Sequence, residues 1–113
     1  MKIQIKNGLH ANGLSPGVAY AVIGIDDMHY RVINDNKEPV LYRNDIFNVM
    51  DPHVPEHWVR REYSDGEFYL EPPEFSEIGF FEDYFDGKKS AVVEYNRYLV
   101  LCDIKKQGPS GTA

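Results

Sequence analysis

The sequence is poor in three features that whole classes of protein require. Its 113 residues include a single cysteine, Cys102, so no disulfide bond can form within the chain. Lysine and arginine supply 12 residues against 18 aspartate and glutamate residues, and this net charge of −6 disfavours non-specific binding to nucleic acid. No apolar run approaches the roughly 20 residues that a membrane-spanning helix needs. The composition therefore argues against a disulfide scaffold, a non-specific nucleic-acid binder and a helical membrane protein.

Signals for export and for cofactor binding are also lacking. Residues 1–6 alternate polar and apolar side chains, which is typical of a strand, and they lack the long apolar core of a signal peptide. The chain has no Asn-x-Ser/Thr sequon, no Gly-rich phosphate loop and no EF-hand spacing. We therefore expect a cytoplasmic protein that uses no cofactor.

Turn residues are abundant, and in the first half they separate short apolar runs. Asp26–Met28 and Asn34–Lys37 contain residues that favour tight turns and hairpins. Arg43–Phe47 predicts a short turn of helix. Such close spacing of strands is typical of a meander or a small barrel. The strands are predicted at residues 1–6, 18–25, 29–33, 39–42 and 47–50.

Acidic and aromatic residues are concentrated in the second half. Between Glu56 and Asp86 there are ten acidic residues and two basic ones, a net charge of −8. Eleven of the fifteen aromatic residues lie between Trp58 and Tyr98. Charge and rings are therefore both localised in one segment of the chain.

The second half is predicted to begin with a hairpin and to continue with one short helix. Phe81 and Phe85 are four residues apart and Ile78 lies one turn earlier, which predicts an apolar helical face. Gly87 is suited to end this helix. The predicted elements are hairpin strands at 58–63 and 68–70, a helix at about 79–86, a pair of strands at 91–95 and 98–104, and a flexible tail at 105–113.

A loose pattern of tyrosines and turn residues runs from Gly17 to Asp51. It consists of Pro16-Gly17-x-x-Tyr20-x-Val22, Tyr30-Arg31-Val32-Ile33-Asn34-Asp35, Tyr42, Ile46-Phe47-x-Val49 and Asp51-Pro52. This pattern resembles small bacterial SH3-like barrels, and the resemblance implies that its aromatic residues form the core and one exposed groove. The whole chain also resembles small accessory proteins of bacteria and phages, among them immunity proteins that neutralise a neighbouring toxin.

Patterning and resemblance together predict a mainly β fold. We expect a small SH3-like barrel or meander with an added aromatic-rich hairpin, one short helix and a C-terminal strand pair. Residues 1–104 are predicted to form a single domain, in which an SH3-like half at 1–51 precedes an acidic, aromatic-rich extension at 52–104.

One segment matches a metalloprotease pattern. His53-Val54-Pro55-Glu56-His57 has the form H-x-x-E-H, which needs both imidazoles on one face of a helix. Pro55 is tolerated best at the first position of a helix, which leaves His53 outside it. We therefore predict a Pro-rich linker here, with no metal site and no catalytic residue.

The acidic, aromatic segment favours a non-enzymatic binding protein. Interfaces favour aromatic anchors surrounded by a charged rim, and an acidic surface attracts a basic partner. The concrete hypothesis is an immunity-type inhibitor that holds a basic protein. The predicted partner-binding residues are Tyr69, Glu71, Glu74, Glu77, Glu82, Asp83 and Asp86.

Three other classes of function stay open. An SH3-like module would bind an extended or Pro-containing peptide in a groove near Tyr20, Tyr30 and Tyr42. A small hydrolase or metalloprotein would depend on the histidine segment described above. A homo-oligomer would pair exposed aromatic residues between copies.

Overall fold

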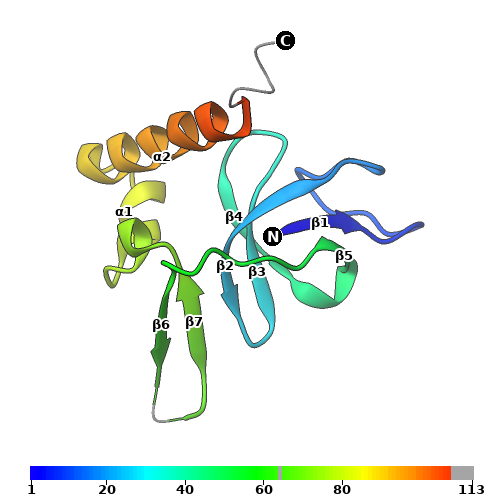
Figure 1. Cartoon of the computed structure of the whole chain (residues 1–113), viewed down its shortest axis with the longest axis horizontal. Helices are drawn as coiled ribbons and strands as arrows, with labels where there is room; N and C mark the ends of the chain where they lie inside the picture. Colours follow the sequence, from blue (N-terminus) through cyan, green and yellow to red (C-terminus); the bar gives the residue numbers. More distant parts are fainter. Residues whose placement is uncertain (64, 108–113) are drawn as a thin grey trace. The chain divides into compact units, whose positions relative to one another are not determined.

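The computed structural model describes residues 1–63 and 65–107, with side chains described as far as Leu101. The chain divides into two compact units, Met1–Pro73 and the residues from Glu74 onwards. We call them unit 1 and unit 2 and describe each by itself (Figure 1). The observed division falls after Pro73, whereas the sequence suggested a change of character at Asp51. The assignment of residues 1–104 to a single domain stays a prediction.

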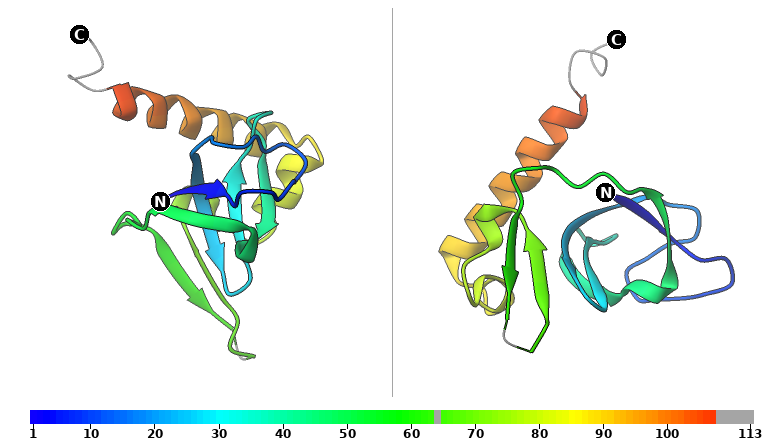
Figure 2. Two further views of the ribbon diagram at one scale, coloured as in Figure 1. Left: turned by 90° about the vertical axis from the view of Figure 1, so that its right-hand side faces the viewer. Right: turned by 60° about the horizontal axis from the view of Figure 1, so that its bottom comes forward.

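Unit 1 is built on an antiparallel sheet in the order β4-β3-β2-β1-β5. A 3-10 turn, η1 (Asn44–Ile46), connects β4 to β5. Figure 2 shows these strands curling around a common interior, an arrangement compatible with a small β-barrel-like fold. The strands are β1 (Lys2–Ile5), β2 (Tyr20–Asp26), β3 (His29–Ile33), β4 (Pro39–Arg43) and β5 (Phe47–Asp51).

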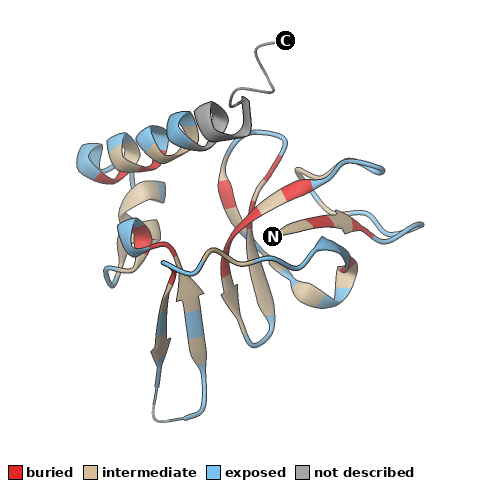
Figure 3. Cartoon of the chain, viewed as in Figure 1, coloured by how far each residue is buried: buried red, intermediate tan, exposed pale blue. Residues whose placement is uncertain are grey.

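The core of unit 1 follows from the alternation of side chains along these strands. In β1, Ile3 and Ile5 are buried while Lys2 and Gln4 are only partly covered, as a period of two requires. Figure 3 shows the buried positions along β1 and β2. The buried cluster comprises Ile3, Ile5, Tyr20, Val22, Val32 and Phe47.

A second hairpin extends the sheet of unit 1. It consists of β6 (Val59–Glu62) and β7 (Phe68–Glu71). β7 also pairs with β2, where Ile25 lies opposite Leu70 and Asp26 lies opposite Tyr69. In the described part of the chain the sheet therefore has seven strands, and the predicted mainly β fold with an added hairpin is confirmed.

Unit 2 contains two helices and a core of aromatic rings. The helices are α1 (Phe80–Phe85) and α2 (Lys89–Gln107), and a 3-10 turn, η2 (Pro73–Phe75), leads into the unit. Phe75 is 1% exposed and is the central ring. The rings whose centroids lie within 4.7–6.0 Å of the Phe75 centroid are those of Phe80, Phe81, Tyr95 and Tyr98.

The predicted strand pair at 91–95 and 98–104 is wrong, because these residues lie in α2. Ala91, Tyr95 and Tyr98 recur at helical spacing and cover the aromatic core, so burial of one helical face outweighs the β propensity of the valines. The predicted tail also begins too early, since α2 runs to Gln107. The rest of the predicted tail, residues 108–113, lies outside the described residues.

Candidate functional site

The seven predicted partner-binding residues are divided between the two units. Tyr69 and Glu71 belong to β7 in unit 1. The other five, Glu74, Glu77, Glu82, Asp83 and Asp86, lie in unit 2, in and around α1. The predicted set is therefore divided between a strand of unit 1 and the α1 segment of unit 2.

The segment around α1 exposes two large apolar side chains among carboxylates. Ile78 is 81% exposed and Phe85 is 51% exposed. Between Glu74 and Asp86 the sequence has five acidic residues and no basic one. We call this set the acidic patch; it comprises Glu74, Glu77, Ile78, Glu82, Asp83, Phe85 and Asp86.

The way α1 begins explains why Ile78 lies outside the helix. Gly79, at the start of α1, has φ = +83°, a left-handed conformation that interrupts the helical register between Ile78 and the helix. Inside α1, Phe80 and Phe81 contact Phe75, and Phe85 is the last residue of the helix. The predicted helical face therefore includes Phe81 and Phe85, whereas the prediction is wrong for Ile78, which lies outside the helix.

The charge of the acidic patch is largely uncompensated. Lys88 Nζ lies 3.4 Å from Asp83 Oδ2, an exposed ion pair of small energetic value. Within the described residues, the other four carboxylates of the patch make no ion pair. Most of the negative charge in the segment that exposes Ile78 and Phe85 is therefore not neutralised by ion pairs.

Glu71 occupies a different environment, on the sheet of unit 1. Its half-buried position raises the pKa of its carboxyl, and the positive charges of Arg31 and Arg61 partly offset this rise. A Cβ at Gly24 would lie 4.0 Å from Glu71 Oε2 and 3.1 Å from Arg31 Cβ. The glycine thus leaves room for the Arg31 side chain, and two arginines of the same sheet act on the Glu71 carboxyl.

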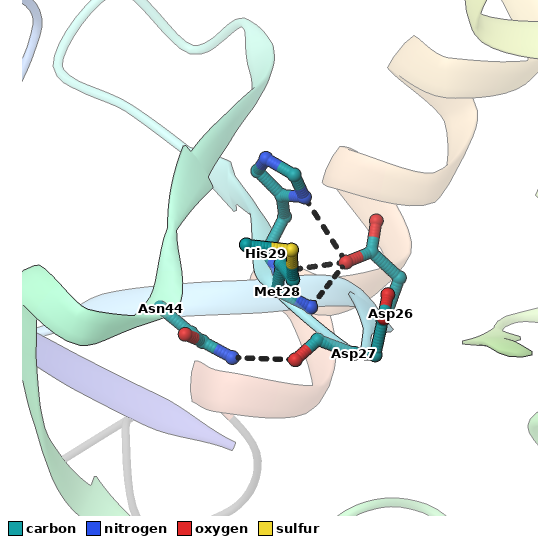
Figure 4. A network of polar contacts seen from close by, with 5 residues as sticks. All are labelled: Asp26, Asp27, Met28, His29 and Asn44. Carbon is teal, nitrogen blue, oxygen red and sulfur yellow. Dashed lines mark hydrogen bonds and ion pairs between the residues drawn. The ribbon is translucent and has the colours of Figure 1, made fainter. Parts of the chain in front are cut away.

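The β2–β3 turn contains a histidine–aspartate pair that serves the turn itself. Asp26 Oδ1 accepts hydrogen bonds from the backbone N–H of Met28 at 2.8 Å and of His29 at 2.7 Å, and lies 3.1 Å from His29 Nδ1. Asn44 Nδ2 donates to Asp27 O at 3.3 Å (Figure 4). The same carboxylate oxygen holds two backbone amides, which confirms the predicted turn role of Asp26.

The H-x-x-E-H segment does not form a helix. Residues 52–58 have no regular secondary structure, and the His53 N–H donates to Asp51 Oδ1 at 2.9 Å. His53 and His57 are therefore not neighbours on a helical face. The predicted linker conformation is confirmed.

The three tyrosines of the alternative groove border the core of unit 1. Tyr20 is 5% exposed and belongs to the buried cluster. Tyr30 and Tyr42 are partly buried, and their ring centroids lie 6.0 and 6.1 Å from that of Phe47. Tyr30 and Tyr42 therefore both lie beside the ring of Phe47, whereas Tyr20 is part of the buried core.

Hydrogen bonds of tyrosine and serine hydroxyls connect the β1–β2 loop with the β3–β4 turn and with β4. Tyr20 Oη donates to Asp35 Oδ1 at 2.6 Å, and Ser15 Oγ donates to Asp35 Oδ2 at 2.8 Å. Tyr42 Oη donates to Asn12 O at 2.6 Å. The hydroxyls of Tyr20 and Ser15 stabilise the charged carboxylate and hold the pKa of Asp35 below its ordinary value.

The stability of unit 1 is expected to depend on pH through Asp35. Because the folded-state pKa is lower than the unfolded-state pKa, the contribution is complete above the unfolded value and is lost as the pH falls through the folded value. Between about pH 5 and about pH 2 the urea midpoint of the wild type should therefore fall more steeply than that of Asp35→Asn. Parallel pH profiles for the two proteins would contradict this role.

Comparison with protein-family models, curated proteins and solved structures finds no match for this chain. In the portion of the chain that the structure describes, no helix combines the length and the apolar character required to cross a membrane.

Proposed function

We propose that this chain is a non-enzymatic protein-binding module that holds a basic protein partner on the acidic patch of unit 2. The exposure of Ile78 and Phe85 among five carboxylates carries the proposal. Large apolar side chains at the centre and charged groups at the rim are the usual anatomy of an interface. An immunity-type inhibitor of a basic toxin is its most concrete form.

The two kinds of residue have separable roles in this proposal. Carboxylates steer a basic partner and raise the association rate, an effect that salt weakens. Apolar anchors desolvate in the complex and slow its dissociation. Substitutions in the acidic patch should therefore separate the two rate constants.

The test begins with capture of the partner from the native host on the tagged full-length chain, followed by its identification and purification. The double variant Ile78→Ser/Phe85→Ser should raise the dissociation rate at least about tenfold, because each lost anchor removes on the order of 1–2 kcal/mol. Glu77→Lys/Glu82→Lys should instead lower the association rate and flatten its salt dependence. Both rate constants are measured by surface plasmon resonance.

Met50→Ser is the matched control for the loss of apolar anchors. Met50 is 56% exposed and Phe85 is 51% exposed, but Met50 lies in β5 of unit 1. Its replacement should leave both rate constants unchanged. If the Ile78/Phe85 variant dissociates at the wild-type rate, the acidic patch is not the binding surface.

A peptide-binding SH3-like module is the second candidate. What supports it is the small β-barrel-like sheet in the order β4-β3-β2-β1-β5, together with the pattern of tyrosines and turn residues from Gly17 to Asp51 that resembles SH3-like barrels. With Tyr20 buried, the peptide would meet the partly exposed rings of Tyr30 and Tyr42. Chemical-shift mapping with Pro-containing peptides separates the candidates, since responses before Asp51 favour this one.

A further inference from the structure

A pair of exposed tyrosine rings projects from the β6–β7 hairpin of unit 1. Tyr63 directly follows β6 and Tyr69 lies in β7; their ring centroids are 5.6 Å apart at an interplanar angle of 86°. Tyr63 is 43% exposed and Tyr69 is 38% exposed. The Tyr63 N–H donates to Glu67 O at 2.9 Å, which fixes the backbone beside the pair. Two ring faces are thus held together at the surface.

Negative charge acts on one ring of this tyrosine pair. Asp26 lies directly opposite Tyr69 in the β2–β7 pairing, and directly paired residues share a face of the sheet. Partial burial raises the pKa of the Tyr69 hydroxyl, and the charges of Glu67, Asp26 and Asp27 raise it further. Three negative side chains therefore act on one ring of the pair.

Three positive or potentially positive side chains lie in the same part of unit 1. Arg61 lies opposite Tyr69 in the hairpin, and its charge acts on the half-buried Glu71. His29 lies against Asp26 Oδ1, in the turn described above. Arg60 bonds Glu62 and lies over the ring of Phe68, 4.3 Å from its centroid. The charged side chains that shift the pKa of the Tyr69 hydroxyl are nevertheless the carboxylates of Glu67, Asp26 and Asp27.

We propose that the Tyr63–Tyr69 pair binds the guanidinium group of an arginine side chain of a basic partner. A guanidinium plane stacks on an aromatic face, where the ring quadrupole attracts it, and nearby carboxylates strengthen this attraction. The proposal rests on the proposed function in taking the partner to be basic, but the site lies in unit 1 and uses none of the acidic patch. The Tyr63–Tyr69 pair would thus be a second binding point for the partner, occupied by an arginine side chain.

The test titrates the full-length chain with a five-residue peptide that carries one arginine between glycines. The aromatic resonances of Tyr63 and Tyr69 are followed by NMR, and those of Tyr30 serve as the internal reference. Saturable shifts confined to Tyr63 and Tyr69 are expected, with a dissociation constant of about millimolar order, as single cation–π contacts are weak. The absence of saturable shifts at these rings overturns the proposal.

A peptide with citrulline in place of arginine is the matched ligand control. Citrulline keeps the shape of the side chain but has no charge. It should cause at most a small fraction of the shift that the arginine peptide causes. Equal binding of both peptides overturns the assignment of a guanidinium site.

Substitutions in the pair complete the test. Tyr69→Leu and Tyr63→Leu should each weaken binding of the arginine peptide about fivefold, because each removes a ring face. Tyr69→Phe keeps the ring and should bind within about twofold of the wild type. If Tyr69→Leu binds as tightly as Tyr69→Phe, the ring is not the binding element.

The peptide titration and the partner experiment fail independently. The titration needs no native partner and depends on Tyr63 and Tyr69. The partner experiment depends on Ile78 and Phe85. A failed titration therefore overturns the guanidinium site alone, and an unchanged dissociation rate in the Ile78/Phe85 variant overturns the acidic patch alone.

Discussion

Gly13→Ala is expected to destabilise unit 1 by about 3 kcal/mol, a large effect for one methyl group. Gly13 has φ = +82°, and a Cβ there would lie 2.6 Å from Asn34 Nδ2 and 2.9 Å from Tyr42 Oη. The left-handed conformation costs an alanine about 1–2 kcal/mol. Relief of the clash would also break hydrogen bonds of Tyr42, whose hydroxyl accepts from Asn34 and donates to Asn12.

Gly17→Ala separates the two causes of this loss. Gly17 has φ = +76° and lies in the same loop, but nothing lies within 4 Å of the point that a Cβ would occupy there. Gly17→Ala should therefore lose only the free energy that the left-handed conformation costs an alanine, about 1 kcal/mol. Urea unfolding followed by the fluorescence of Trp58, the single tryptophan, gives both values. Equal losses in the two variants would show that the loop accommodates the methyl group without breaking its bonds to Asn34 and Tyr42.

The contacts around Gly13 were not predictable from the sequence, although the strands beside them were. The strands and hairpins of unit 1 were predicted because turn residues such as Asn34–Lys37 act on their own neighbours. The attachment of the loop at residues 7–17 to Asp35 and Tyr42 was not predicted, because those hydrogen bonds join residues that are far apart in the sequence and depend on the folded register.

The C-terminal helix was mispredicted because two local signals conflict there. Val92, Val93 and Val100 favour strands, whereas Ala91, Tyr95 and Tyr98 have helical spacing. A short apolar run does not distinguish the two-residue period of a strand from the 3.6-residue period of a helix. The aromatic core of unit 2 decides in favour of the helix, and the position of that core was not predictable from the local sequence.

The acidic patch was only partly predictable for a related reason. The excess of carboxylates is visible in the sequence and led to Glu82, Asp83 and Asp86. The exposure of the apolar anchors was not predicted, because Ile78, Phe81 and Phe85 have helical spacing and were grouped as one apolar helical face. The available signal was Gly79, which interrupts that spacing with its left-handed conformation.

Phe75→Ala is expected to destabilise unit 2 by about 4 kcal/mol, within the range for buried phenylalanine. Phe75 is 1% exposed, and its ring lies at the centre of the aromatic core. The ring centroid of Tyr98 is 4.7 Å away and that of Phe80 is 5.0 Å away, so the substitution leaves a cavity lined by rings of both helices. A unit of this size has little stability to lose. We therefore expect much of the helical circular dichroism at 222 nm to disappear at room temperature.

Phe85→Ala is the matched control, because it removes the same side chain from the same unit. Phe85 is 51% exposed and ends α1, so its loss removes little buried area and should cost less than about 1 kcal/mol. The helical signal should persist in this variant, while Phe75→Ala loses it. If both variants keep the signal and unfold at the same urea concentration, the stability of unit 2 does not depend on the ring cluster around Phe75, and α2 must be held by other contacts.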